Sequence, residues 1–341
     1  MSINGLQRTG RSNINAFACL RVIMKILVTG AAGQIGSELV PALREKYGAD
    51  NVIALYHSNV PDDHGLHEIG DAGDKEFVKR LIIDYDVSTV YHLVGILSAK
   101  GEKDPDLAYK VNMSTLKNVL DIARERKDSG KPMKVFWPSS IAAFGPTTPR
   151  DMTPQKTVLE PATMYGVTKV AGELLVNYYF NKYGIDVRGL RYPGIISWKT
   201  PPGGGTTDYA VEIFYGAIKE KRYTSFLRED TYLPMMYMDD AVRATIELME
   251  ADAARVGIRT SYNITAVSFS PEEIAAEIGK KVPGFMMDYK PDFRQSIADS
   301  WPKSIDDSSA RRDWGWKHRF GLGEIVDDML KNLGPKLSQG R

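Results

Sequence analysis

The chain has 341 residues, of which 43% are hydrophobic and 26% charged, and its formal net charge is +1. This composition is typical of a globular protein with one large or two modest domains, and the near-neutral charge argues against nucleic acid or a membrane surface as partner. The single cysteine, Cys19, excludes an intramolecular disulfide and a cysteine-cluster metal site, no apolar run has membrane-spanning length, and we expect no bound metal.

Residues 1–23 precede the first predicted strand and carry Arg8, Arg11 and Arg21 but no acidic residue. Mitochondrial presequences share this composition. We favour a disordered tail outside the fold, or an early start with Met24 as the true first residue, because terminal segments are commonly disordered. We therefore expect a cytoplasmic protein, with the mitochondrial matrix as the alternative if the segment is a transit peptide.

A strand, a glycine turn and a helix are predicted next. The run 26–28 is apolar, as in an inner parallel strand, and the run 38–47 is amphipathic, as in a helix. Between them Gly30, Gly33 and Gly36 follow the pattern G-x-x-G-x-x-G. Glycines let the backbone turn tightly and approach a ligand, and a helix N-terminus attracts phosphate. In this context the pattern predicts a dinucleotide site; the alternative is a glycine-rich turn without a ligand.

The second strand, expected at 51–56, lacks the acidic residue that dinucleotide folds usually place about 20 residues past the glycines to bind the adenosine ribose. It ends at Tyr56, and the next acid is Asp62. No Arg or Lys stands there to bind a 2′-phosphate either, so this position does not settle the choice between NAD and NADP. Asp71 follows a third predicted strand, where its carboxylate would reach the adenine amine or cap a helix.

Two further predicted strands end in groups that would face a cofactor. The strand expected at 87–94 contains His92, which we interpret as a packed core histidine rather than a base. The strand expected at 134–137 leads into Ser139 and Ser140. Small residues at the carboxyl end of a strand allow a cofactor to lie across it.

Tyr165 and Lys169 are four residues apart, so one face of a helix carries both. A free tyrosine hydroxyl titrates near ~10, and a neighbouring ammonium favours the phenolate and lowers its pKa. Tyr165 is therefore predicted to act as a general base, with Ser140 orienting the substrate oxygen. The alternative is an ordinary amphipathic helix surface.

The glycine turn, the pair Ser139-Ser140 and the motif Tyr165-x-x-x-Lys169, in this order, resemble the extended short-chain dehydrogenase/reductase superfamily, which includes UDP-galactose 4-epimerase. The resemblance covers about residues 24–335. Further stretches resemble the short-chain type of L-threonine 3-dehydrogenases, and they lie at 92–99, 190–197, 202–210, 233–238 and 297–302. One departure is Tyr56, which stands where these enzymes usually place the ribose-binding acid.

This resemblance implies roles for the matching positions. The catalytic residues would be Ser140, Tyr165 and Lys169. NAD would be bound by Gly30, Gly33, Gln34, Ile35, Gly36, Asp71, Leu93, Ser139, Tyr165, Lys169, Tyr192, Pro193 and Ile195. The substrate would be bound by Ser98, Ser140, Tyr165, Gly205, Thr206, Thr207 and Trp301. A loop of three glycines followed by two threonines could also bind a carboxylate through N–H groups and hydroxyls, or serve only as a flexible connector.

We expect an α/β fold, a doubly wound parallel sheet of the Rossmann type, with a smaller C-terminal substrate-binding domain. The NAD-binding domain would comprise 24–193 and 235–267, and the substrate-binding lid would comprise 194–234 and 268–335. Ser270 and the proline and acids after it predict a helix start. The pairs Met235-Met236 and Trp314-Trp316 are interpreted as core packing.

The implied reaction is NAD-dependent oxidation of the L-threonine 3-hydroxyl to 2-amino-3-ketobutyrate. The alternatives are a nucleotide-sugar epimerase and a cofactor-sensing protein without catalysis; a dehydratase is disfavoured because Ile141 follows Ser140, where that reaction needs acids. The predicted helices 106–126 and 165–183 carry surplus apolar surface, extended on the second by Tyr178, Tyr179 and Phe180. This surplus, like the resemblance, predicts a homodimer.

Overall fold

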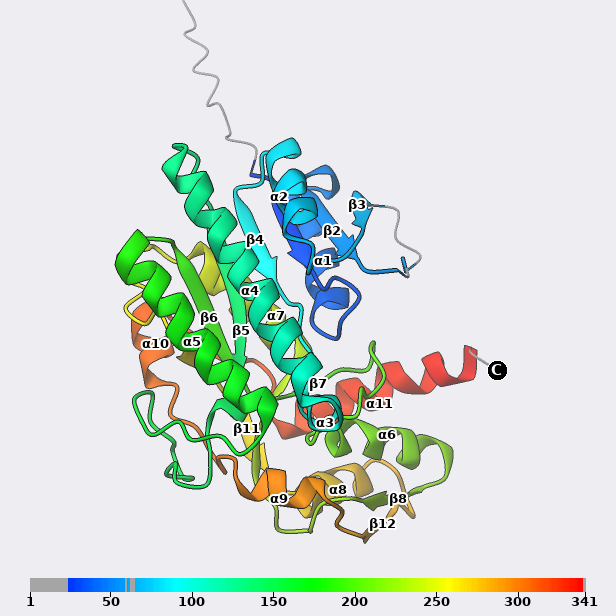
Figure 1. The fold of residues 1–341 in the computed structure, drawn as a ribbon. Coiled ribbons are helices and arrows are strands. Elements are labelled where there is room, and N and C mark those ends of the chain that lie inside the picture. The colour runs from blue at the N-terminus through cyan, green and yellow to red at the C-terminus, as the bar shows by residue number, and fades with distance from the viewer. Residues whose placement is uncertain (1–23, 59, 62–64, 340–341) are drawn as a thin grey trace, which may run out of the picture.

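The structure is a computed structural model that describes residues 24–58, 60–61 and 65–339 (Figure 1). The expectations for the segment 1–23, including Cys19, and the acid Asp62 lie outside the described residues. In the described part of the chain, no helix is both long and apolar enough to cross a membrane.

A seven-stranded sheet, parallel at every pairing, forms the larger part of the molecule, in the order β10-β6-β5-β4-β1-β2-β3. Its strands are β1 Ile26–Thr29, β2 Val52–Tyr56, β3 His67–Ile69, β4 Thr89–His92, β5 Lys134–Ser140, β6 Val187–Tyr192 and β10 Tyr262–Asn263. The chain runs from β1 outward to β3 and then returns to β4 on the other side of β1. The carboxyl ends of β1 and β4 therefore form a topological switch point, the place where open α/β sheets bind ligands.

Helices cover both faces of this sheet (Figure 1). One face packs against α1 Gly36–Tyr47, α7 Met238–Glu250 and α10 Ser308–Trp314. The other packs against α2 Lys75–Asp84, α4 Pro105–Asp128 and α5 Met164–Tyr183. The short segments η1 Ala49–Asn51, α3 Ser98–Lys103 and η2 Ile141–Ala143 connect these elements. The predicted doubly wound α/β fold is confirmed.

A second region with its own apolar core lies beyond the carboxyl ends of the sheet (Figure 1). It contains a sheet of order β11-β9-β7 and the parallel pair β12-β8. Its strands are β7 Gly194–Ile196, β8 Arg222–Ser225, β9 Leu233–Tyr237, β11 Val267–Phe269 and β12 Met286–Tyr289. Its helices are α6 Tyr209–Lys219, α8 Pro271–Gly279, α9 Arg294–Asp299 and α11 Leu322–Gln339. The helix start at Ser270 is confirmed as a capping box with Glu273.

One element was expected in the wrong sheet. Residues from Met235 were predicted to return to the main sheet, but β9 pairs with β7 and β11, and only β10 rejoins the main sheet. Every residue of β9 is buried, and a short buried strand has the same apolar pattern in either sheet. Met235 and Met236 are fully buried, and Trp314 and Trp316 lie in the core, as predicted.

The first prediction concerns Gly36, which begins α1. A Cβ at this position would lie 2.4 Å from the carbonyl oxygen of Gly30 and 2.8 Å from the Cα of Ala31. Because these neighbours are backbone atoms, Gly36→Ala should destabilise the fold by about 1–3 kcal/mol, the usual effect of overpacking. Urea unfolding without cofactor measures this.

The matched control is Gly279→Ala in the last turn of α8, where an added Cβ meets no atom within 4 Å. Alanine is the better helix former, so this variant should be about 0.5–1 kcal/mol more stable. Equal unfolding midpoints for Gly36→Ala and the wild type would contradict the account of the turn.

Candidate active site

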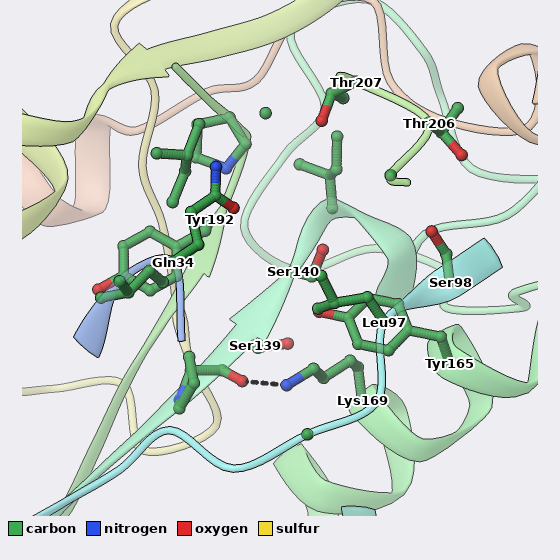
Figure 2. A pocket seen from close by; sticks show the side chains of 18 of the residues that line it. Gln34, Leu97, Ser98, Ser139, Ser140, Tyr165, Lys169, Tyr192, Thr206 and Thr207 are labelled. Atoms are coloured by element: carbon green, nitrogen blue, oxygen red, sulfur yellow. Dashed lines mark hydrogen bonds between the residues drawn. The ribbon is translucent and has the colours of Figure 1, made fainter. Parts of the chain in front are cut away.

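Two cavities meet at the switch point and share Leu93 and Gly95 in their walls. The larger, of about 740 Å³, lies on the β2 side and is lined by Gly30 and Asp71 among others. The smaller, of about 150 Å³, is lined by the carboxyl end of β5, the start of α5 and the loop before α6 (Figure 2). Together they form an extended site with two halves. We call them the adenosine cavity and the catalytic cavity.

The glycine turn separates the two cavities and fits a diphosphate. Gly30 has φ +71°, and a Cβ there would lie 3.0 Å from the backbone of Leu93 and Val94, so only glycine fits without strain. Helix α1 begins at Gly36, and the preceding Ile35 has no side chain that caps it. Its N-terminal N–H groups and dipole therefore suit the anionic linker of a dinucleotide.

The adenosine cavity lacks a carboxylate at the end of β2. Tyr56 is buried there, with its ring edge-on to His67 at a centroid distance of 6.0 Å. Asp71 lines the cavity and accepts a hydrogen bond from Gly73 N at 2.7 Å. The alternative that Asp71 caps a helix is wrong, because Asp74 caps α2 by accepting from Phe77 N.

His92 is a core residue, as predicted. Its ring is fully buried and lies between the hydroxyls of Thr29, at 2.8 Å, and Thr115, at 3.0 Å. Burial, together with the charge of Lys169, lowers the pKa of His92 to about 3. The ring therefore stays neutral and does not serve as a base near neutral pH.

The three predicted catalytic side chains meet in the catalytic cavity (Figure 2). Ser140 ends β5, and Tyr165 and Lys169 lie on the first turns of α5. Thr163 caps α5 by accepting a hydrogen bond from Gly166 N at 3.1 Å. The ammonium of Lys169 donates to the carbonyl oxygen of Pro138 at 2.5 Å and lies 5.2 Å from the centre of the Tyr165 ring. The serine, the tyrosine and the lysine thus share one buried corner.

The electrostatics of this corner differ from the prediction. Burial raises the pKa of Tyr165 to about 12, and the hydroxyl of Ser140 opposes the rise. Burial also lowers the pKa of Lys169 to about 7, against the charge of Glu173. The expectation that Lys169 brings Tyr165 below its ordinary pKa is wrong for the protein without ligands, because desolvation dominates for both groups. A positive charge brought by a ligand would favour the phenolate.

A buried ion pair behind this corner was missed from the sequence. Arg191 on β6 donates to both carboxylate oxygens of Glu173, at 2.8 and 2.6 Å, and both side chains are at most 3% exposed. Ser139 donates to the same carboxylate at 2.6 Å. Glu173 lies one turn after Lys169, and this spacing on the predicted helix was the available signal.

The loop before α6 brings polar groups to the opposite wall of the catalytic cavity (Figure 2). The hydroxyl of Thr206 is buried and has no hydrogen-bond partner among the described residues. Thr207 lies beside it, and Trp301, 5% exposed, closes another side. Asp208, which was not predicted, holds the loop by accepting from Gly204 N at 2.7 Å and Gly205 N at 2.8 Å. An unpaired buried hydroxyl facing a cavity suits a polar ligand.

The predicted site residues are distributed as follows. The adenosine cavity is lined by Gly30, Gly33, Asp71 and Leu93. The catalytic cavity is lined by Gln34, Ile35, Leu93, Ser98, Ser139, Ser140, Tyr165, Lys169, Tyr192, Pro193, Ile195, Gly205, Thr206, Thr207 and Trp301. Only Gly36, among the predicted residues, lines neither cavity; it packs under the turn.

A doubly wound sheet, a glycine turn at its switch point and a serine, a tyrosine and a lysine at the adjoining strand end define a dinucleotide-dependent enzyme of the α/β class. The chain belongs to the NAD dependent epimerase/dehydratase family, whose model matches residues 26–265. NAD is accordingly the cofactor, and the two cavities beside the glycine turn fit it.

Similar proteins span nearly the whole chain. An uncharacterized epimerase/dehydratase of Staphylococcus haemolyticus is 48% identical, over 92% of this chain and 98% of its own. A GalE-like L-threonine dehydrogenase from Cupriavidus necator, solved in its holo form, is 55% identical with a TM-score of 0.88, over 91% of this chain and 99% of its own. A structure described as a monomeric L-threonine 3-dehydrogenase from a metagenome is 50% identical with a TM-score of 0.87, at the same coverage.

The second prediction concerns the cofactor. No Arg or Lys adjoins Tyr56, so NAD should bind more tightly than NADP. Tyr56→Asp should bind NAD about 10-fold more tightly, because a carboxylate at this position accepts charge-assisted hydrogen bonds from the ribose hydroxyls. Titration of both cofactors by fluorescence measures this.

Tyr56→Asn is the matched control, since it removes the same ring without adding a charge, and it should gain less. A clear preference of the wild type for NADP, or equal NAD affinity in Tyr56→Asp and Tyr56→Asn, would refute this account of the ribose position.

Proposed function

We propose that this protein oxidises the 3-hydroxyl of L-threonine with NAD, giving 2-amino-3-ketobutyrate. The observation that carries the proposal is the small catalytic cavity, of about 150 Å³, in which the Ser140, Tyr165 and Lys169 corner faces Thr206 and Thr207. Its size suits a free amino acid. The L-threonine dehydrogenases similar to this chain support the same substrate.

The chain's own residues suggest how the reaction proceeds. Ser140 would donate to the substrate oxygen, and Tyr165 would take the proton of the 3-hydroxyl. Lys169 would hold a positive charge below the tyrosine ring and bind the nicotinamide ribose. NAD, when bound, supplies the hydride acceptor and a positive ring, which favours the phenolate of Tyr165. Since burial raises the pKa of Tyr165 to about 12, the phenolate fraction should rise with pH above neutrality, while Lys169, whose pKa burial lowers to about 7, loses its charge over the same range.

The substrate's carboxylate and its methyl group each have a partner of suitable chemistry. The hydroxyls of Thr206 and Thr207 can donate to the carboxylate, and Trp301 offers apolar surface to the methyl group. A nucleotide sugar would instead need cations for its diphosphate. Among the described residues that line this cavity, Lys169 is the one cation, and it is bonded to a carbonyl oxygen.

Threonine-dependent formation of NADH by the wild type, with a UDP-sugar assayed in parallel, tests the proposal. NADH formation with threonine and no change in the UDP-sugar supports it. Epimerisation of the UDP-sugar without threonine oxidation would favour the epimerase alternative instead. Binding of the cofactor without either reaction would favour the cofactor-sensing alternative.

We also propose the predicted domain division, 24–193 plus 235–267 for NAD and 194–234 plus 268–335 for the substrate, with one change: the rest of β9, to Tyr237, belongs to the second region, whose apolar core contains Met235 and Tyr237. We place the protein in the cytoplasm, supported by its bacterial relatives. Import of a reporter fused to residues 1–23 into mitochondria would favour the matrix instead.

The third prediction concerns the general base. Tyr165→Phe keeps the ring but removes the hydroxyl, so turnover should fall by about 10²–10⁴-fold. NAD affinity, followed by fluorescence, should change little. Steady-state kinetics with threonine measure turnover, and more than half of wild-type turnover in this variant would contradict the assignment.

The fourth prediction concerns substrate binding. Thr207→Ala and Trp301→Ala should each lower kcat/KM for threonine while NAD affinity stays nearly unchanged. Loss of one charge-assisted hydrogen bond at Thr207 corresponds to about 1.5–3 kcal/mol, or ~10- to 150-fold in kcat/KM. The control is Thr224→Ala on β8, where the threonine is exposed. Wild-type threonine kinetics in both variants would exclude this part of the proposal.

The fifth prediction concerns assembly. Helices α4 and α5 expose large apolar side chains, which are Leu107, Tyr109, Val167, Leu174 and Tyr178. Tyr179, expected on the same surface, is instead 3% exposed and packs inward, and Phe180 is half-buried. We propose an isologous dimer through these helices, which light scattering at micromolar concentration should detect.

Leu174→Glu should dissociate this dimer because it places a charge on the shared surface. Phe293→Glu, an exposed apolar residue outside these helices, is the control and should not. A monomeric wild type, as described for the metagenome enzyme, would contradict the dimer.

A further inference from the structure

We propose that Glu38 is a positioning residue that couples NAD binding to the placement of the substrate-binding loop. The inference rests on the proposed function only for the identity of the substrate. Glu38 is the third residue of α1, directly after the turn that fits the diphosphate, and its carboxylate is nearly fully buried.

The carboxylate of Glu38 holds the segment that follows β7. Ser197 donates its hydroxyl hydrogen to one oxygen of Glu38, and the ammonium of Lys199 lies 3.2 Å from the other. Ser197 also accepts from the backbone N–H of Lys199 at 3.0 Å. A second contact joins the same elements, because the hydroxyls of Ser37 and Thr200 are 3.1 Å apart. The first turn of α1 therefore fixes residues 197–200.

The same segment continues into the groups that face the substrate. Pro201 and Pro202 lead to three glycines and then to Thr206 and Thr207. An added Cβ at Gly203 or Gly204 would meet no atom within 4 Å, and Gly204 has φ +88°. The glycine stretch is thus loosely packed, and glycines permit large backbone changes.

Buried carboxylates anchor both ends of this strap, residues 201–207. Asp208 binds the N–H groups of Gly204 and Gly205 at the α6 end. Glu38 holds the end next to α1. The two anchors differ in one respect: only Glu38 belongs to the helix whose N-terminus would bind the diphosphate, since Gln34 and Ile35 line the catalytic cavity four and three residues before it.

A physical coupling follows from this arrangement. A diphosphate on the N-terminus of α1 would restrict the motion of the first turn of that helix. Through Glu38 it would also restrict the position of Ser197 and of the start of the strap. A substrate that binds afterwards then loses less conformational entropy in ordering the loop. This gives positive cooperativity between the two ligands. By linkage, threonine should tighten NADH by the same factor.

The variants Glu38→Gln and Ser197→Ala each alter one partner of the hydrogen bond between Ser197 and Glu38. NADH and threonine do not react with each other, so the dissociation constant of NADH can be measured by fluorescence with and without threonine. In the wild type threonine should tighten NADH by a factor within the usual ~5–150-fold range. In both variants this factor should fall toward 1, while NADH alone still binds.

Kinetics should show the same division. The KM for threonine should rise in both variants with little change in kcat, because Glu38 touches neither ligand nor the reacting atoms. The matched control is Lys46→Gln on the same helix, which breaks an exposed ion pair to Glu250 on α7 and leaves the loop untouched. If the buried variants fail to fold, Lys199→Met breaks the contact from a side chain that is 48% exposed and should act in the same direction.

Hydrogen exchange of residues 197–208 separates this inference from the proposed function. NADH alone should protect this segment in the wild type and in Lys46→Gln, but not in Glu38→Gln, whether or not the protein oxidises threonine. Equal protection in Glu38→Gln and the wild type would overturn the inference, as would an unchanged coupling factor. A wild type that shows NADH-dependent protection but no threonine oxidation would overturn the proposed function alone.

Discussion

The ion pair between Glu173 and Arg191 is the interaction on which the catalytic corner depends. It joins α5 to β6, and the hydroxyl of Ser139 adds the end of β5 to the same carboxylate. Removing one partner of such a pair leaves an uncompensated buried charge, which costs about 3–5 kcal/mol. The pair also acts on chemistry, since Glu173 opposes the burial that lowers the pKa of Lys169. One carboxylate thus holds the strand and the helix that present Ser140 and Tyr165, and supports the charge of Lys169.

Burial affects different kinds of side chain in the two halves of the site. In the catalytic corner it raises the pKa of Tyr165 and lowers that of Lys169, so the protein alone disfavours the charged forms of both. The charge that corrects this is expected from the oxidised cofactor, and chemistry is thereby restricted to the complex. At the end of β2 the buried residue is Tyr56, a neutral side chain where dinucleotide folds usually place an acid. Under the proposed function the two halves of the site differ in role: the adenosine cavity binds the cofactor and the catalytic cavity holds the reacting groups.

The sequence predicted the fold and the shared helix face of Tyr165 and Lys169 from local spacing, and it placed Ser140 with them through the order of the motifs and the family resemblance. The glycine turn follows a strand directly, and a four-residue spacing on a helix fixes a shared face. It did not predict the sheet to which β9 belongs, since a short buried strand has one pattern in any sheet. It also missed three contacts: the ion pair of Arg191 with Glu173, the hydrogen bonds of Asp208 with Gly204 and Gly205, and the hydrogen bond of Ser197 with Glu38. The partners are far apart in the chain, or one of them is a backbone N–H group, so no sequence pattern marks them. The predicted effect of Lys169 on Tyr165 was wrong because spacing does not report desolvation.

The central claim is that, in the small catalytic cavity, Tyr165 takes the proton of the 3-hydroxyl and NAD takes the hydride from the carbon that bears it. The most direct test uses L-threonine that carries deuterium at C3, with NAD and the wild-type protein, followed by mass analysis of the reduced cofactor. The account predicts one deuterium in each NADH formed, with slower turnover than for unlabelled threonine wherever hydride transfer limits the rate. NADH that carries no deuterium, or no NADH at all from a protein that binds NAD, would contradict it.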